Sequence, residues 1–312
     1  MKSKQRSLTV LTQKTFRLKN WQLWVMILPA LVYLIVFNYL PMYGVQLAFR
    51  DFKFGAGIAG GDWAGLKYFE MYFSSPMFLP TLKNTFLISF STIVFGFPMP
   101  ILLALILNQL RSQRFKKVVQ TTVYLPYFIS TVVLVSLINI LLSPTTGLVD
   151  DLLKTIGIIP EAANLLGDTI YFIPVYVISG IWQACGWNSI IFLAALSAVD
   201  TQLYDACKID GANRWQIVWN IELPSIMPTI IILLIMNMGN ILSVGFEKTF
   251  LMQNNLNKGI SEVISTYVFN VGLKSSQFSF GSAVGLFNTF INFIFLLIAN
   301  SISKKVSDVS LM

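Results

Sequence analysis

Long apolar runs alternate with polar stretches along the whole chain. A helix that crosses the hydrocarbon core of a bilayer needs about 20 mostly apolar residues. The runs that meet this length cover residues 22–43, 85–109, 118–142, 170–199, 227–246 and 280–302. The pattern therefore predicts an all-α integral membrane protein with six transmembrane helices, organised as a single transmembrane domain over residues 1–312.

Basic residues gather in alternate polar stretches. The leader, residues 1–20, contains Lys and Arg but no acidic residue, and a second basic cluster occupies 111–117. Basic residues beside a span mark its cytoplasmic end. Placing these segments, the loop 200–226 and the tail from Ser303 inside puts 14 of the 22 Lys and Arg in the cytoplasm. Both termini are therefore expected there, and the length of the first run favours an uncleaved anchor over a signal peptide.

The composition supports a membrane protein and excludes several other classes. Hydrophobic residues make up 55% of the chain and charged residues only 12%, against about 25% charged in soluble domains. The net charge of +8 comes from clusters beside the spans, so no nucleic acid is expected as a partner. Histidine is absent, and Cys185 and Cys207 lie in unlike surroundings. We therefore expect no catalytic residues, no metal site and no disulfide.

The spans contain no charged residue near their centres. Ion-coupled carriers often place an ionisable group there, although backbone carbonyls can also hold an ion. The chain also has no GxxxxGK[ST] nucleotide-binding loop, and "NVGLKSS" at 270–276 resembles one only superficially. Active transport would therefore draw its energy from a partner. The lack of basic residues in the spans favours a neutral solute, although lysines in the loops could still hold an acidic one.

Neutral polar side chains do occur within the spans. Such groups can simply form hydrogen bonds between helices. As a set, they also suit a path for a hydroxyl-rich solute, because amides donate and accept hydrogen bonds and indole rings stack on sugars. The candidates for this path are Trp187, Asn188, Asn237, Asn240 and Asn288.

The charged stretch "YDACKIDGANRWQIVWNIELPS", residues 204–225, predicts two short helices around a turn. Asp200 or Thr201 can cap the first helix, and Gly211 can end it in a left-handed conformation. Asn213 and Gln216 have the spacing of a capping box for the second helix. Pro224 is expected to end that helix and Pro228 to begin the next span. A compact, doubly capped pair of this kind suits docking to a partner better than an ordinary loop does.

The same stretch resembles the EAA loop of ABC importer permeases. Asp205-Ala206-Cys207 correspond to the opening Glu-Ala-Ala, Gly211 to the glycine, and Ile221-Glu222-Leu223-Pro224 to the closing Ile-x-Leu-Pro. Aspartate at 205 and cysteine at 207 depart from the motif but keep its charge or size. The residues that the resemblance assigns to coupling with an ATPase are Tyr204, Asp205, Ala206, Cys207, Asp210, Gly211, Ala212 and Arg214.

Further segments extend the resemblance over nearly the whole chain. "DWAGLKYF", "LPYFIS", "GWNSIIFLAAL" and "GFEKTFLM" look like the maltose-type carbohydrate-uptake permeases, in particular their polysaccharide and complex-oligosaccharide branch. The resemblance implies the MetI-like permease fold in a bacterial plasma membrane, with import of an oligosaccharide or polysaccharide. The implied partners are a second, related permease, two ATP-binding cassette subunits that hold ATP and Mg, and an extracellular solute-binding lipoprotein.

Two alternatives remain open on the sequence. An ion-coupled secondary carrier of a neutral solute would transport without any ATPase. A membrane-bound enzyme or scaffold has weaker support, because no nucleophile and base are paired in the sequence.

Overall fold

The structure, a computed structural model, describes residues 21–58 and 60–307, so the basic leader lies outside the described residues. The α-helices in chain order are α1 (Trp21–Leu34), α2 (Lys67–Phe73), α3 (Phe78–Ser91), α4 (Pro98–Asn108), α5 (Gln113–Tyr124), α6 (Thr131–Leu141), α7 (Leu148–Thr155), α8 (Thr169–Ser197), α9 (Thr201–Ile209), α10 (Arg214–Ile217), α11 (Leu223–Met238), α12 (Phe246–Met252), α13 (Lys258–Ser261), α14 (Ile264–Tyr267) and α15 (Phe278–Ser307). Between them lie π- or 3-10-helical stretches: η1 (Ile35–Tyr39), η2 (Leu40–Phe49), η3 (Thr92–Gly96), η4 (Leu125–Phe128), η5 (Val218–Glu222) and η6 (Val268–Lys274). In the described ranges, β pairing is limited to an isolated bridge between Arg50 and Trp63.

Continuous helical stretches that are long and apolar enough to cross a membrane overlap five of the predicted ranges. They are Leu23–Phe49, Phe78–Asn108, Thr169–Ser197, Arg214–Met238 and Phe278–Lys304. Several are built from an α-helix joined end to end with a π-helical turn, as α3, η3 and α4 are at Thr92–Gly96. These stretches form an all-helical membrane domain.

The predicted third span, 118–142, is not one straight helix. Gln113–Phe128 and Thr131–Leu141 meet at an angle of 97°. Two local causes explain the break. Pro126 cannot donate the hydrogen bond that would continue α5, and the hydroxyl of Ser130 accepts a hydrogen bond from the backbone N–H of Val133, which starts α6 as a new helix. Gln113–Phe128 and Thr131–Leu141 are long and apolar enough for a sixth span only when the two helices are taken together.

The predicted fifth span, 227–246, is displaced in the structure. The helix already begins at Arg214 and runs to Met238, so Pro224 does not end it and Pro228 lies inside it. The π-helical turn η5 explains this, because the N–H of Leu223 donates to the carbonyl of Val218, five residues back, and the ladder passes the proline without a break. After Met238 the chain turns and re-enters a short helix, α12.

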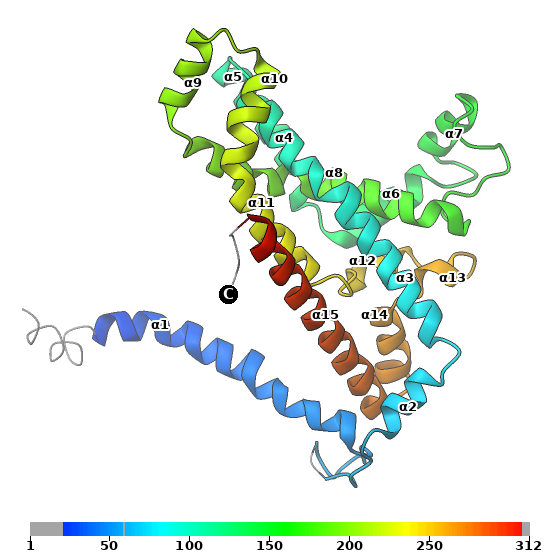
Figure 1. Cartoon of the computed structure of the whole chain (residues 1–312). Helices are drawn as coiled ribbons and strands as arrows, with labels where there is room; N and C mark the ends of the chain where they lie inside the picture. Colours follow the sequence, from blue (N-terminus) through cyan, green and yellow to red (C-terminus); the bar gives the residue numbers. More distant parts are fainter. Residues whose placement is uncertain (1–20, 59, 308–312) are drawn as a thin grey trace, which may run out of the picture.

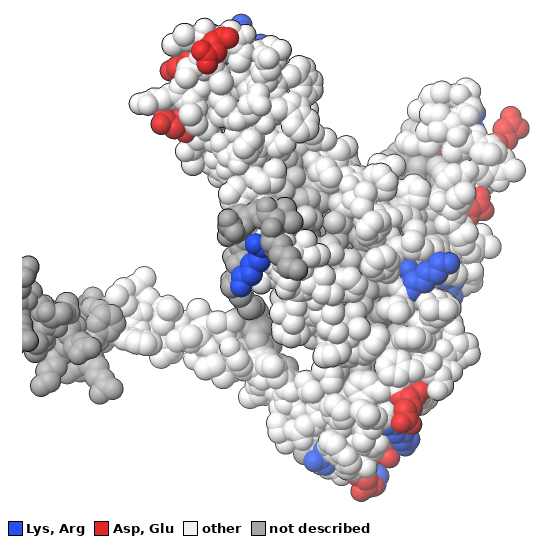
Figure 2. Space-filling view, in the orientation of Figure 1, with Lys and Arg blue, Asp and Glu red and all other residues white. Residues whose placement is uncertain are grey.

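The core lies where α4, α8 and α11 pack together and where α15 meets α2 and α14. Ile101, Phe192 and Ile226 belong to the first cluster, and Tyr72 and Phe280 to the second. Figure 1 shows α1 standing apart from this bundle, with α9 and α10 at one extremity and α2 at another. The acidic side chains visible in Figure 2 lie towards the ends of the molecule, and the few basic side chains over its middle stand on an otherwise uncharged surface.

Candidate functional site

The stretch after the long helix α8 forms the predicted first short helix, α9, and the predicted turn, whereas the predicted second helix, α10, is the beginning of the continuous helix that runs to Met238. Asp200 Oδ1 accepts a hydrogen bond from Gln202 N (2.9 Å), which caps α9. Asn213 and Gln216 form a reciprocal capping box at the start of α10, with distances of 2.7 and 2.9 Å. The capping predictions are thus confirmed, and both short helices have ordered beginnings.

Gly211 joins the two helices in the left-handed conformation that the sequence predicts, with φ of +75°. Its N–H donates to the carbonyl of Lys208 (3.2 Å), and the N–H of Ala212 donates to the carbonyl of Cys207 (2.9 Å). This paired arrangement is a Schellman motif, in which a residue without a side chain satisfies the last carbonyls of a helix. The turn is therefore specified by the backbone and does not depend on contacts with the rest of the molecule.

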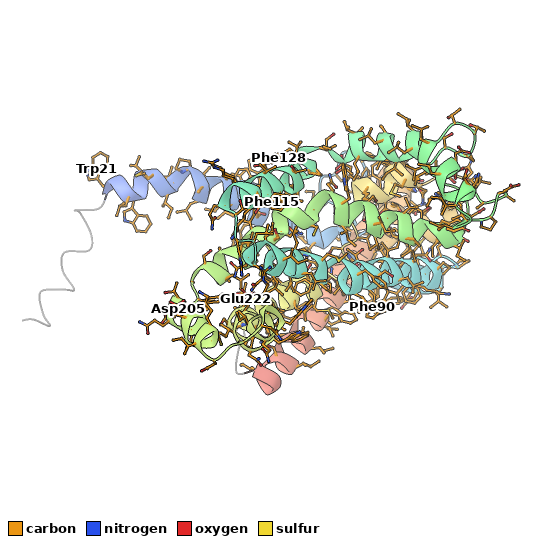
Figure 3. All side chains as sticks on the ribbon, turned by 90° about the horizontal axis from the view of Figure 1, so that it is seen from above. Trp21, Phe90, Phe115, Phe128, Asp205 and Glu222 are labelled. Atoms are coloured by element: carbon orange, nitrogen blue, oxygen red, sulfur yellow. The ribbon has the colours of Figure 1, made fainter. Side chains whose placement is uncertain are left out.

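The outer surface of this pair is exposed and partly apolar. Ile209 is 86% exposed, Trp215 74% and Trp219 63%. Asp205 forms an exposed ion pair with Lys208 (2.9 Å) and lies at the outer rim of α9 (Figure 3). Of the other predicted coupling residues, Tyr204, Cys207 and Ala212 are partly buried, whereas Ala206, Asp210, Gly211 and Arg214 are exposed.

A buried carboxylate fixes the base of the pair against a neighbouring span. Glu222 has no exposed surface, and its Oε1 accepts hydrogen bonds from the side-chain amides of Asn108 (2.6 Å) and Gln109 (2.8 Å) at the end of α4. The hydroxyl of Tyr204 lies 3.4 Å from the same oxygen. Glu222 thereby connects α9, η5 and the end of α4, so these elements are held together where the helix pair meets the membrane domain.

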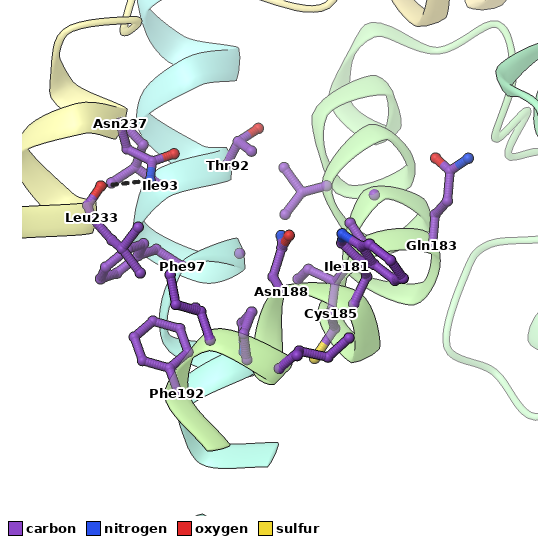
Figure 4. A pocket seen from close by; sticks show the side chains of 18 of the residues that line it. Thr92, Ile93, Phe97, Ile181, Gln183, Cys185, Asn188, Phe192, Leu233 and Asn237 are labelled. Carbon is purple, nitrogen blue, oxygen red and sulfur yellow. Dashed lines mark hydrogen bonds between the residues drawn. The ribbon is translucent and has the colours of Figure 1, made fainter. Parts of the chain in front are cut away.

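A cavity of about 790 Å³ lies between the long helices. Figure 4 shows Thr92 on η3, Gln183 and Asn188 on α8, and Asn237 on α11 around it. Most of the remaining lining side chains are apolar or aromatic. A concave, largely apolar site with a few polar groups is the usual form of a small-molecule site.

The structure places three of the five predicted path residues in this cavity and two outside it. Trp187, Asn188 and Asn237 line it, and Asn240 and Asn288 are absent from its lining. Asn240 is exposed and donates to the carbonyl of Met236 (3.1 Å), because the chain turns away after Met238. The Oδ1 atom of Asn288 is buried without a hydrogen-bond partner in the described structure.

Lys248 is a lining residue that the sequence pattern does not reveal. The residue falls between the predicted fifth and sixth spans, but α12 folds back and carries its side chain into the cavity wall, where it is 9% exposed. Burial lowers the pKa of Lys248, which is outside the membrane spans, to about 8, so the ammonium is mostly charged at neutral pH. The cavity wall therefore includes a basic residue that the uncharged spans do not predict, and the expectation of a neutral solute stays a prediction.

The signal available in the sequence is the segment "GFEKTFLM" itself, which carries part of the family resemblance and in which Lys248 stands between Glu247 and Thr249 shortly after a predicted span.

The comparisons with known proteins agree with this architecture. The permease protein YteP of the polygalacturonan/rhamnogalacturonan transport system of Bacillus subtilis (strain 168) is 43% identical over 286 residues, which cover 92% of this chain and 88% of the relative. The arabinooligosaccharides transport system permease protein AraP of the same organism is 30% identical over 75% of this chain and 73% of its own length.

Solved structures give the same result. A chain of a bacterial alginate ABC transporter, in complex with an alginate pentasaccharide-bound periplasmic protein, matches with a TM-score of 0.84 and 38% identity, covering 94% of this chain and 97% of that chain. A chain of the MetNI methionine ABC transporter matches with a TM-score of 0.50 and 14% identity, covering 73% of this chain and 94% of that chain, which shows the fold alone.

The fold and the exposed helix pair together define a membrane permease of the importer type, with the MetI-like arrangement of helices. The chain belongs to the family of binding-protein-dependent transport system inner membrane components, whose family model matches residues 96–308. It is accordingly a multi-pass transport protein of a bacterial plasma membrane, and a transport component rather than an enzyme.

Proposed function

We propose that the chain is one permease subunit of an ATP-driven importer that moves an oligosaccharide or polysaccharide into the cell. The observation that carries this proposal is the doubly capped helix pair α9–α10, which projects from the ends of two spans and presents exposed apolar side chains. Family membership supports the same conclusion. The eight residues predicted for coupling, from Tyr204 to Arg214, form or flank this projection.

In the proposed mechanism, ATP binding closes two partner ATPase subunits around the projection. Trp215, Ile209 and the charges of α9 supply the docking surface, because large apolar side chains and arginine dominate protein–protein interfaces. ATP and Mg are held by those partners and not by this chain. We take the docking side to be the cytoplasm, and the distribution of basic residues supports cytoplasmic termini as part of the same proposal.

The proposal includes a second, related permease. Residues 23–43 of the first span are all exposed, and α1 stands apart from the bundle (Figure 1). A helix that extends away from its own domain is suited to pack against another subunit as well as lipid.

The proposed substrate arrives from an extracellular solute-binding protein. It would occupy the cavity lined by Trp187, Asn188 and Asn237, where amides meet hydroxyl groups and an aromatic ring meets the apolar face of a sugar. One face of the Trp187 indole stacks on Tyr127 at 4.6 Å between centroids, so only the remainder of the ring is open to a sugar.

Copurification tests this proposal directly. An affinity-tagged chain, solubilised from its own membrane in mild detergent, is expected to retain an ATP-hydrolysing subunit and a second permease. Reconstituted together, these subunits should take up oligosaccharide only with ATP and a loaded solute-binding protein. Transport by the purified chain alone, driven by a proton or sodium gradient, would instead establish the secondary-carrier alternative.

A further inference from the structure

The cavity contains one charged side chain among its described lining residues, Lys248 of α12. The other groups around it are apolar, aromatic or neutral polar. Discrimination between a charged and a neutral solute in this part of the cavity therefore depends chiefly on one ammonium group.

The protein itself uses only part of the hydrogen-bonding capacity of that ammonium. One N–H of Lys248 donates to the backbone carbonyl of Tyr176 (2.7 Å), and Nζ lies 4.4 Å from the centroid of the Tyr176 ring. It forms no ion pair with any carboxylate of the described residues. An ammonium has three N–H donors, so beside the carbonyl and the ring face of Tyr176 there is donor capacity left for a ligand. A buried cation without an anionic partner is costly, and a bound anion would offset that cost.

The facing helix leaves space at this point. A Cβ atom added to Gly180 of α8 would lie 3.2 Å from Lys248 Nζ, which is closer than most side chains tolerate. Glycine at 180 therefore lets the ammonium lie against α8 without being pushed out of position. The amides of Asn188 and Gln183 line the same cavity and suit neutral hydroxyl groups.

We propose that Lys248 is a carboxylate-binding residue of the translocation cavity and that the cavity takes an acidic glycan built from uronic acids. The inference rests on the proposed importer function and specifies its substrate class. The carboxylate of a uronic acid unit accepts a hydrogen bond from the remaining donor capacity of Lys248, the lining amides meet the hydroxyl groups of the unit, and its apolar ring face lies on the open part of Trp187. A charge-assisted contact in a water-poor cavity supplies the preference over a neutral sugar.

The test uses the complete reconstituted transporter with oligogalacturonate and oligoalginate as probes, each beside its carboxyl-reduced, neutral counterpart of equal length. Uptake is compared for the wild type and for Lys248→Gln, Lys248→Arg and Gly180→Ala. Lys274→Gln is the matched control, because Lys274 also lies over an aromatic ring, Phe250 at 5.1 Å, but does not line the cavity. The affinity of the solute-binding protein for each probe is measured separately and is the same for every variant.

The wild type is expected to import at least one acidic probe faster than its reduced counterpart. Lys248→Gln should lower uptake of that probe by roughly tenfold to a hundredfold, the usual effect of losing a charged hydrogen-bond partner. Lys248→Arg should keep much of the acidic preference, and Gly180→Ala, which favours helix formation, should reduce the preference without loss of protein from the membrane. Lys274→Gln should behave as the wild type.

Three results overturn the inference while leaving the importer function intact: no acidic preference in the wild type, Lys248→Gln uptake equal to the wild type, or equal losses for acidic and reduced probes. The last would show that Lys248 only fastens α12 to α8. If Lys248→Gln does not reach the membrane, Lys248→Arg and Gly180→Ala decide the question by their acidic-to-reduced ratios. Failure of the proposed function looks different, because no oligosaccharide would then be taken up with ATP.

Discussion

The turn at Gly211 gives the sharpest test of the coupling role, because its requirements are fixed by backbone geometry. The residue has φ of +75°, which proline cannot adopt because its ring holds φ near −65°. Proline also lacks the N–H that donates to Lys208. In addition, it disfavours the helical conformation of the preceding residue, and Asp210 is helical at φ −71° and ψ −1°. Gly211→Pro therefore removes the Schellman motif by three separate effects.

Alanine at the same position is expected to have a milder effect on the turn. No heavy atom lies within 4 Å of an added Cβ at Gly211, so Gly211→Ala suffers only the left-handed strain of about 1–2 kcal/mol. The proline variant costs at least about 3 kcal/mol locally, which shifts the docking-competent population by more than about a hundredfold. Substrate uptake should fall severalfold for alanine and disappear for proline, while both variants remain inserted in the membrane.

The chain offers a matched control at the end of α7. Gly157 has φ of +76°, open space around an added Cβ, and the same hydrogen-bond pair, from Gly157 N to the carbonyl of Lys154 and from Ile158 N to that of Leu153. Gly157→Pro thus introduces the same local strain away from the proposed docking surface. The assay is retention of the ATPase by the tagged chain, with ATP-dependent uptake measured in parallel. Wild-type retention and uptake by Gly211→Pro, or equal loss in Gly157→Pro, would refute the docking role.

Further predictions concern the packing around the two sites. Glu222→Ala leaves the amides of Asn108 and Gln109 without their acceptor and should lower the free energy of unfolding by about 1–3 kcal/mol per unsatisfied group. Glu222→Gln keeps one acceptor oxygen and should lose less stability. Equal losses in the two variants would contradict the role of Glu222 in holding α9 and η5 to the end of α4. Gly186→Ala places a Cβ 1.9 Å from the carbonyl oxygen of Val123, so α5 and α8 must separate and the amount of folded protein should drop, as size-exclusion chromatography of the complex would show. Asn292→Leu breaks its hydrogen bonds to Leu242 N (2.8 Å) and Ser243 Oγ (3.0 Å), and should lower the melting temperature more than Thr289→Val, which loses only a bond to its own helix.

The sequence predicts the α9–α10 pair well because its determinants are local. Asp200, Asn213 and Gly211 each act on backbone groups within a few residues, so spacing alone identifies the caps and the turn. The same holds for most of the long helices, where length and apolarity suffice. The fold class therefore follows from the sequence alone.

The predicted span boundaries are wrong where one or two residues decide whether a helix breaks or continues. The range 118–142 is apolar enough to be one span, although Gln120, Thr121 and Thr122 make its first part more polar, and its length alone does not distinguish a straight span from two helices at 97°. The decisive feature is Pro126 followed by the capping hydroxyl of Ser130. Conversely, Pro224 suggests a helix end. The helix nevertheless continues past it, because the π-helical turn before Pro224 accommodates a residue that has no backbone N–H to donate.

The cavity is harder to predict because its lining depends on contacts between distant segments. Asn237 and Asn240 are three residues apart on neighbouring turns, yet only Asn237 faces the cavity, since the chain leaves the helix after Met238. Lys248 enters the wall because α12 folds back against Tyr176, 72 residues away in sequence. Periodicity along one helix does not contain this information.

Continuity of the helix from Arg214 to Met238 explains how the two sites can act on each other. Its start forms the proposed docking surface, and Asn237 near its end lines the cavity. At 1.5 Å per residue, its 25 residues extend for about 37 Å. A rotation imposed at Trp215 is therefore transmitted along one helix to the cavity wall. The carboxylate of Glu222 adds a second route, because it binds the end of the span that carries Thr92 and Phe97 into the same cavity. Movement of the helix pair thus reaches two adjacent helices of the cavity wall together, and these two helices face α8 across the cavity (Figure 4).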